Sequence, residues 1–239
     1  MSVIGQSSRE LHQPAGLISI VVPIFNEEAN ADELFTKLQA VRDQMAVPIE
    51  LVFVDDGSQD GSFELAKRFA QTHSRVRVLK LSRNFGSHAA IMAGLCQSTG
   101  DCVIFMAGDL QDPPALLAEL IARWQKGFKI VWAARIVPDK ISSSLYWQLA
   151  NWVSNNGFPV GGVDFALLDR KVVDALVQQA HVHTCVFVQI AATKFDADVV
   201  SYEKLARKRG KSGWTLKKKL GHVFLLLLAS IKPLRVLLM

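Results

Sequence analysis

Short apolar runs alternate with amphipathic segments along the first 135 residues of this 239-residue chain. Each short run fits a buried strand, and each longer segment repeats apolar residues at every third or fourth position, as a helix does. This alternation predicts an α/β fold with a mostly parallel central sheet flanked by helices. The expected strands are 17–22, 49–55, 76–81, 103–106 and 129–133, and the expected helices are 28–44, 60–73, 87–97 and 114–126.

The remainder of the chain follows a less regular pattern. We expect a helix at 139–158, a short strand at 161–169 and a helix from about 170 to 180. A chain of this length can form one large domain with a well-buried core. Residues 1–16 contain no apolar stretch, so we expect a flexible leader there and no secretory signal.

The fourth expected strand runs into a polar group, Asp109-Leu110-Gln111-Asp112-Pro113-Pro114. Ligands of open α/β sheets lie outside the carboxyl ends of the strands. The Asp109 carboxylate and the Gln111 amide oxygen, two residues apart in an extended segment, point the same way and suit a hard divalent cation. The alternative is an Asx-type turn followed by a proline that starts a helix.

Two further strand ends carry acids. Asn26-Glu27-Glu28 follows the first strand, and Asp55-Asp56-Gly57-Ser58 ends the second. Adjacent acids are costly unless a ligand, a metal or a helix N-terminus uses them; the alternative use of Ser58 or Asp60 is to cap the next helix. The chain has neither a G-x-G-x-x-G fingerprint after the first strand nor a Walker A loop. Together these features predict a nucleotide whose phosphates are held through a metal.

The positive charge of the chain is local. The formal charge is +5, but the eight cations within 204–219, a stretch without acids, leave −3 for all other residues. A localised patch of this kind favours an anionic membrane surface over a nucleic-acid partner. The apolar part of 220–239 is too short to span a bilayer, so we expect an amphipathic helix at the membrane interface; the alternative is a core helix with a solvated basic face. The cations are Lys204, Arg207, Lys208, Arg209, Lys211, Lys217, Lys218 and Lys219.

The three cysteines are widely spaced and lie in apolar contexts. This spacing fits neither a disulfide framework nor a zinc site. We therefore expect Cys96, Cys102 and Cys185 to be reduced core residues of a cytoplasmic protein.

Four segments resemble, in the same order along the chain, the motifs of the family 2 glycosyltransferases. The resemblance is strongest to the polyprenyl-phosphate branch of that family and covers about residues 17–235. It implies the GT-A fold and an inverting transfer from a nucleoside-diphosphate sugar. The nucleotide of this donor can be either UDP or GDP. The segments are Ser19–Glu27, Val54–Ser58, Ser82–Gly86 and Asp109–Pro114.

The resemblance also implies roles for the residues that would hold the sugar donor. A divalent ion there would neutralise the charge that develops on the leaving diphosphate, which places Asp109 among the catalytic residues. The implied donor-side residues are Pro23, Asn26, Glu27 and Asp55 in the nucleoside pocket, Asp56 near the nucleotide, and Asp109 and Gln111 on Mg²⁺ or Mn²⁺.

Two later segments resemble the acceptor side of the family. Gly162–Arg170 is similar to G-D-F-R-L-L-D-R and implies that Asp164 lies near the acceptor, as a catalytic base or as an orienting carboxylate. A phosphate acceptor is already ionised at pH 7 and hardly needs a base; the alternative for Asp164 is a helix cap or a buried turn acid. Arg207–Trp214 is similar to R-x-x-G-x-S-K-[YW], in which Arg207 and Ser212 would bind the diphosphate or the acceptor phosphate.

The chain departs from the family pattern at three positions. Ala107 stands where the family usually has the first Asp of D-x-D, Gly213 replaces a frequent Lys, and Ala166 replaces a frequent Arg. With one carboxylate fewer, the affinity for the metal should be lower. Lys232–Arg235 resembles the P-L-R sequence that precedes the transmembrane hairpin of the family.

We therefore expect a catalytic domain at 17–213, with a nucleotide-binding half at 17–135, an acceptor half at 136–213 and a juxtamembrane segment at 214–239. The expected activity is sugar transfer to polyprenyl phosphate in cell-envelope polysaccharide synthesis. The protein would lie at the inner face of the cell membrane, either peripherally or through an anchor if the chain is a piece of a longer one. The alternatives are a saccharide or protein acceptor, and a catalytically weak nucleotide-sugar-binding protein. The oligomeric state is not fixed by the sequence, and a homo-oligomer that packs through residues 223–239 is one possibility.

Overall fold

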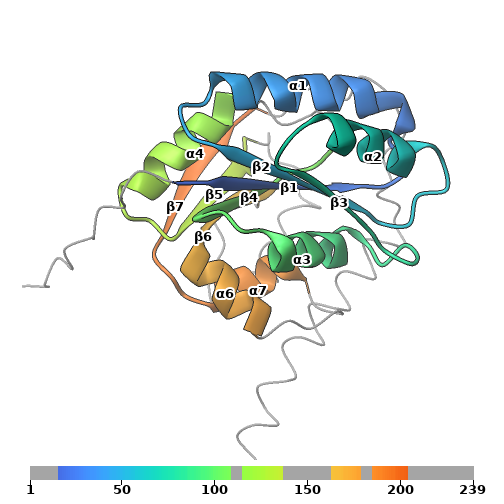
Figure 1. The fold of residues 1–239 in the computed structure, drawn as a ribbon. Helices are drawn as coiled ribbons and strands as arrows, with labels where there is room; N and C mark the ends of the chain where they lie inside the picture. Colours follow the sequence, from blue (N-terminus) through green and yellow to red (C-terminus); the bar gives the residue numbers. More distant parts are fainter. Residues whose placement is uncertain (1–15, 109–114, 137–162, 179–184, 204–239) are drawn as a thin grey trace, which may run out of the picture.

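A computed structural model describes residues 16–108, 115–136, 163–178 and 185–203 of the chain. These residues form one seven-stranded sheet in the order β3-β2-β1-β4-β6-β5-β7, with helices on both faces (Figure 1). The strands are β1 (Ile18–Ile24), β2 (Ile49–Asp55), β3 (Val76–Lys80), β4 (Cys102–Phe105), β5 (Ile130–Arg135), β6 (Phe165–Asp169) and β7 (Ala197–Tyr202). The helices are the 3₁₀ turn η1 (Glu28–Asn30), α1 (Ala31–Gln44), α2 (Ser62–Thr72), α3 (Ser87–Gln97), α4 (Ala115–Gln125), α6 (Arg170–Gln178) and α7 (Val186–Ala192).

The sheet is mostly parallel, as the alternation of strands and helices predicts. β1 pairs in parallel with β2 and β4, and β2 with β3, whereas β6 runs antiparallel to both β4 and β5. The last strand, β7, is parallel to β5. As a result, the carboxyl ends of all these strands except β6 meet at one edge of the sheet, together with the amino end of β6.

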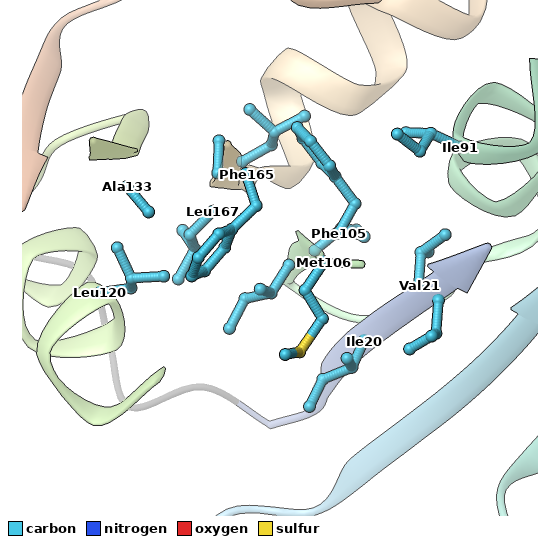
Figure 2. Packing of buried hydrophobic residues seen from close by; sticks show 14 of the residues in the cluster. Ile20, Val21, Ile91, Phe105, Met106, Leu120, Ala133, Phe165 and Leu167 are labelled. Carbon is cyan, nitrogen blue, oxygen red and sulfur yellow. The ribbon is translucent and has the colours of Figure 1, made fainter. Parts of the chain in front are cut away.

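Helices cover the sheet in two layers. Figure 1 shows α1, α2 and α4 on one face and α3, α6 and α7 on the other. Figure 2 shows part of the core between them, with Ile91 of α3 on the side of Val21, and Leu120 of α4 on the side of Leu167. β2 is buried along its whole length, as expected for a strand covered on both faces.

Gly94 allows α3 to lie very close to the sheet. A Cβ added at this position would come within 2.2 Å of Val21 Cγ1 and within 3.2 Å of Val54 Cγ2. Any larger residue would therefore push α3 away from β1 and β2, the strands whose carboxyl ends carry predicted site residues.

A polar network lies at the opposite edge, where the parallel strands begin. The Glu50 carboxylate accepts hydrogen bonds from Ser19 Oγ (2.6 Å), from the Thr99 amide (3.0 Å) and from Arg77 Nη2 (2.6 Å). Burial alone would raise the pKa of Glu50, but these hydrogen bonds and the Arg77 charge outweigh it and hold the pKa below its usual value. The network ties β1, β2 and β3 together at their amino ends.

Several expectations from the sequence need correction. β1 continues to Ile24 and includes Pro23, which we expected to follow the strand. The Met106 amide donates to the Val21 carbonyl, so the missing N–H of Pro23 falls on the β4 side, beyond the last residue pair of those two strands. Cys102 and Cys185 are buried, where desolvation raises the pKa of both thiols, but Cys96 is exposed and is not a core residue.

The sequence pattern did not reveal α7 and β7. The predicted strand at 161–169 is shorter, since β6 covers only Phe165–Asp169, and the predicted helix at 170–180 is α6. The predicted helix at 139–158 and the predicted amphipathic segment at 214–239 lie outside the described residues. Within the described part of the chain, none of the helices combines the length and the apolar character needed to cross a membrane.

Candidate functional site

The carboxyl edge of the sheet brings several of the predicted site residues together. Asn26 and Glu27 follow β1, Asp55 and Asp56 lie at the end of β2, and Asp164 immediately precedes β6. The strand order places β1, β4 and β6 side by side, so the described polar groups after β1 and before β6 flank the end of β4.

Asp55 presents a buried oxygen that no described residue engages. Its side chain is fully buried, and Oδ2 accepts a hydrogen bond from the Ser58 amide at 3.1 Å. The second oxygen, Oδ1, has no hydrogen-bond partner among the described residues. A buried acceptor without a partner costs about 1–3 kcal/mol, so a ligand that donates a hydrogen bond there would remove this cost.

Asn26 joins the loop after β1 to the loop after β2. Its amide donates to Ser58 Oγ at 3.0 Å, and its side-chain Oδ1 accepts from the Gln59 amide at 3.0 Å. Asn26 has a φ of 53°, in the left-handed region that asparagine tolerates better than most residues. Side chain and backbone therefore brace the two loops against each other.

Glu27 and Asp60 extend this brace. The Glu27 amide donates to Ser62 Oγ at 2.8 Å, and its carboxylate accepts from the Asn30 side chain at 2.7 Å. Burial would raise the pKa of Asp60, but hydrogen bonds from the Ser62 side chain and amide and from the Glu28 amide outweigh it and lower the pKa. Asp60 thus holds Ser62, the first residue of α2, although the N-cap position is occupied by Gly61 and not by Ser58 or Asp60 as the capping alternative had it.

Asp56 positions a third loop. Its two carboxylate oxygens accept hydrogen bonds from the Phe85 amide (2.7 Å) and the Gly86 amide (2.9 Å). Gly57 makes this contact possible: it has a φ of 73°, and a Cβ there would lie 2.5 Å from the carbonyl carbon of Arg83. The predicted proximity of Asp56 to the nucleotide stays a prediction; its described contacts stabilise the loop that contains Arg83 and Phe85.

The predicted metal site begins at Asp109, one residue beyond Gly108, where the described part of the segment after β4 ends. Gly108 itself lies close to Ile24 and to the carbonyl oxygen of Pro23, at the carboxyl end of β1. Asp109 and Gln111 themselves lie outside the described residues, as do Arg207 and Ser212. The described residues contain no group of three or more His, Cys, Asp or Glu side chains able to hold a metal ion.

Asp164 faces the same edge from β6. The pairing of Ala166 with Phe105 places Asp164 beside the Met106–Gly108 segment. Its Oδ2 accepts a hydrogen bond from the Tyr202 hydroxyl at 3.0 Å and lies 3.6 Å from Arg135 Nε. The side chain of Asp164 is 14% exposed, so it is accessible from the edge while being held by neighbouring strands.

Sequence reasoning missed Tyr202 and Arg135. Both occupy the final positions of their strands, and the two residues pair with each other in the sheet. The signal available for Arg135 was its place at the end of an apolar run, the same signal that indicated Asp55. Tyr202 gave no such signal because its strand was not predicted.

The chain is similar in sequence to curated glycosyltransferases. The chain is 34% identical over 208 residues to the uncharacterized glycosyltransferase YkcC of Bacillus subtilis, covering 84% of this chain and 64% of YkcC. It is 32% identical over 234 residues to the undecaprenyl-phosphate 4-deoxy-4-formamido-L-arabinose transferase of Pseudomonas aeruginosa, covering 94% of this chain and 68% of that protein. The chain thus spans a little under two thirds of the length of YkcC and similar relatives.

The fold matches solved GT-A structures. The mannosyltransferase PcManGT from Pyrobaculum calidifontis, solved with GDP-mannose and Mn²⁺, superposes with a TM-score of 0.62 at 19% identity, covering 95% of this chain and 67% of that one. The family model described as glycosyl transferase family 2 matches residues 19–173, which include β1 to β6 and every described part of the site except Tyr202. The chain therefore belongs to glycosyl transferase family 2.

Proposed function

We propose that this chain transfers a sugar from a nucleoside-diphosphate sugar to a polyprenyl phosphate, with inversion at the transferred carbon. One observation carries the proposal: the order of groups along the carboxyl edge. Asp55 ends β2, Gly108 leads into Asp109 after β4, and Asp164 precedes β6, in a sheet ordered β2-β1-β4-β6. In this order, the nucleoside would bind at β2 and β1, the diphosphate at β4 and the acceptor at β6.

The nucleoside would bind at the ends of β1 and β2. The partnerless Oδ1 of Asp55 is an acceptor for an N–H group, which both uracil and guanine present. Pro23, Asn26 and Glu27 lie at or just after the end of the neighbouring strand β1, whose Ile24 pairs with Asp55. Hydrogen bonds from Asn26 and Glu27 hold the loops after β1 and β2 together before any ligand binds. A site held in this way loses little conformational entropy on binding.

The diphosphate would lie at the end of β4. A carboxylate from Asp109 and an amide oxygen from Gln111 form a donor set that suits Mg²⁺ or Mn²⁺, and the start of this segment is fixed against Pro23 and Ile24. A bound divalent ion would neutralise the negative charge that develops on the leaving diphosphate. With Ala107 in place of a second acid, the remaining ligands of the ion would include oxygens of the diphosphate.

The acceptor would approach from β6. An oxygen of the acceptor phosphate forms a bond to the sugar carbon while the bond from that carbon to the diphosphate breaks, and the electron pair leaves with the diphosphate. Asp164 would orient the acceptor, and Arg207 and Ser212 would bind its phosphate. Arg207 follows Tyr202 by five residues, which limits its distance from the site to roughly 17 Å.

The lipid acceptor also accounts for the basic segment. Cations within 204–219 would contact anionic headgroups and bring the site to the inner face of the membrane. A relative that shares 32% identity is named as an undecaprenyl-phosphate sugar transferase. This name supports a lipid-phosphate acceptor and leaves the sugar open.

The decisive experiment is a screen of UDP- and GDP-sugars against a short-chain polyprenyl phosphate in detergent with Mn²⁺, analysed by mass spectrometry. We expect a sugar-phosphate lipid to form with at least one donor, and its formation to stop when the metal is chelated. Transfer to a saccharide or peptide in place of the lipid would overturn the proposed acceptor. Metal-independent nucleotide binding, measured by titration calorimetry, without turnover on any polyprenyl phosphate would instead indicate a nucleotide-sugar-binding protein.

A further inference from the structure

Tyr202 contacts the acceptor-side carboxylate from two strands away. Its hydroxyl donates to Asp164 Oδ2 at 3.0 Å, although β5 lies between β6 and β7 in the sheet. Two strand spacings amount to about 10 Å, a gap that a shorter side chain could not bridge. The contact therefore depends on a long side chain with a polar tip.

β5, the strand between β6 and β7, has a small residue where the Tyr202 side chain crosses it. Ala133 of β5 pairs with Phe165 on one side and with Val200 on the other. Tyr202 follows Val200 by two residues and so lies on the same face of the sheet as Ala133. The small side chain of Ala133 leaves room for the Tyr202 ring to pack edge-on against Phe165, with ring centroids 5.6 Å apart.

This packing fixes the direction of the hydroxyl. Tyr202 is only 6% exposed, and its backbone carbonyl accepts a hydrogen bond from the Ile136 amide at 2.8 Å. Asp164 is held in turn through its own amide, which donates to the Ala133 carbonyl at 3.0 Å. Donor and acceptor are thus each attached to the end of β5, so their relative position is set by the sheet.

We infer that Tyr202 is a positioning residue for Asp164. The phenol holds one carboxylate oxygen in a fixed place, and the nearby Arg135 guanidinium faces the same oxygen at 3.6 Å. A carboxylate held through Oδ2 keeps one fixed orientation at the carboxyl edge of the sheet. This inference rests on the proposed function, because it takes Asp164 to act on the acceptor side of the reaction.

The test is a double-mutant cycle with Tyr202→Phe and Asp164→Asn. Tyr202→Phe keeps the ring against Phe165 and removes only the hydroxyl. We expect kcat to fall about tenfold or more, as the loss of a hydrogen bond to a charged group predicts, while KM for the nucleotide sugar changes by less than about twofold, since donor-side loops lie on β1 and β2. In the Asp164→Asn background the same substitution should change kcat by less than about twofold.

Nucleotide-binding stoichiometry from calorimetry gives the folded fraction of each variant, so kcat is expressed per binding-competent molecule. Thr36→Val, which removes an exposed hydroxyl that bonds the Asp32 carbonyl on α1, is the matched control and should leave kcat unchanged. If Tyr202→Phe leaves kcat unchanged, or lowers it equally in both backgrounds, the positioning role is wrong.

The outcome for the wild-type chain separates this inference from the proposed function. If the wild type transfers sugar to no polyprenyl phosphate but hydrolyses the donor, the acceptor assignment is wrong. The double-mutant cycle is then measured with the rate of donor hydrolysis, which decides the role of Tyr202. If the wild type neither transfers nor hydrolyses the sugar of any donor, both proposals are overturned.

Discussion

Asp55 and Asp56 are adjacent carboxylates with different tasks, and only their hydrogen-bond partners distinguish them. Asp56 uses both oxygens on the backbone amides of Phe85 and Gly86, whereas Asp55 uses one oxygen on Ser58 and leaves Oδ1 without a described partner. Both side chains are buried. Partners, and not burial, indicate which of the two acids awaits a ligand.

Asp55→Asn should weaken nucleotide binding without weakening the fold. The amide can still accept from Ser58 through its remaining oxygen, but its NH₂ group would meet the N–H of a nucleobase. We expect about a tenfold loss of affinity for the preferred nucleotide in calorimetry, with little change in the melting temperature.

Asp56→Asn is the matched control for this prediction. It replaces one of two oxygens that hold the loop, so it should lower the free energy of unfolding by about 1–3 kcal/mol. If Asp55→Asn binds the nucleotide as tightly as the wild type, Asp55 does not contact the base.

Asp109→Ala should abolish the metal-dependent part of nucleotide binding. Ala107 already removes one carboxylate from the family pattern, so Asp109 would be the only charged protein ligand in the predicted pair with Gln111. The measurement is calorimetry with and without Mn²⁺. A variant that retains the full effect of Mn²⁺ would show that the metal is held elsewhere.

At the scale of elements, β2 carries an acid near each end, and the two have opposite functions. Glu50 near the start completes the network that joins β1, β2 and β3, while Asp55 at the end faces the site. The strand between them is apolar and buried. One strand thus stabilises the fold at one edge and supplies the site at the other.

Glu50→Gln should destabilise the protein in a pH-dependent way. The pKa of Glu50 in the folded protein lies below its ordinary value of 4.5, so its ionised form contributes stability above that pH and loses it as the pH falls through the folded pKa. We expect the variant to be less stable by about 1–3 kcal/mol at pH 7, with the difference shrinking below pH 4.5.

Chemical denaturation at a series of pH values measures this effect. Glu119→Gln is the control, because that residue is half-exposed and pairs only at the surface with Arg123; its effect should stay within about 0.5 kcal/mol. A destabilisation by Glu50→Gln that does not change between pH 7 and pH 3.5 would argue against an ionic contribution.

The predictable elements were those with a strong local pattern. The bounds of β2 and α3 agree with the sequence prediction because a continuous apolar run and a helical repeat each end at a distinct turn. β7 was not predicted because its residue types do not follow its alternation of exposed and buried positions: the apolar Val199 is exposed, and Asp198 on the more buried side forms an ion pair with Arg123. Its partner, β5, lies more than 60 residues earlier in the chain.

The same distinction holds for the site. Asp55 was predictable because an acid after a buried strand has few structural uses, and Asp164 was indicated through a family resemblance. Tyr202 depends on packing against Phe165 across another strand, a contact that no local pattern encodes. Arg135 needed the exact end of β5, which the apolar pattern placed two residues too early.

For the molecule as a whole, the proposed donor end (β1 and β2) and the proposed acceptor end (β6 to β7) lie at different parts of one sheet edge. The strands of the proposed donor end belong to the first half of the chain. β7 ends at Tyr202, and the basic segment 204–219 follows almost immediately in the sequence. If this segment contacts lipid, the acceptor end faces the membrane and the nucleotide end faces the aqueous side.

The chain should therefore bind vesicles that contain phosphatidylglycerol and bind neutral phosphatidylcholine vesicles only weakly. Each cation near the surface contributes about 1 kcal/mol, so replacing Lys217, Lys218 and Lys219 with Gln should weaken binding about a hundredfold, and added salt should weaken the wild type as well. The measurement is vesicle co-sedimentation.

A triple variant with Lys67, Lys126 and Lys171 changed to Gln carries the same loss of charge on other surfaces and should bind almost as the wild type does. Equal losses in the two triple variants would mean that net charge alone, and not the segment, attracts the protein to lipid.

The seven residues of β2 have a consequence for how this protein can change over generations. Shifting the strand by one position would remove Glu50 from its network and Asp55 from the proposed nucleoside site at once, and would turn each buried side chain to the opposite face of the sheet. We therefore expect insertions and deletions in β2 to be selected against twice, once because they destabilise the fold and once because they disrupt the proposed site. On the proposed function, the loops that follow the strands are where substitutions could change the sugar donor without moving the sheet.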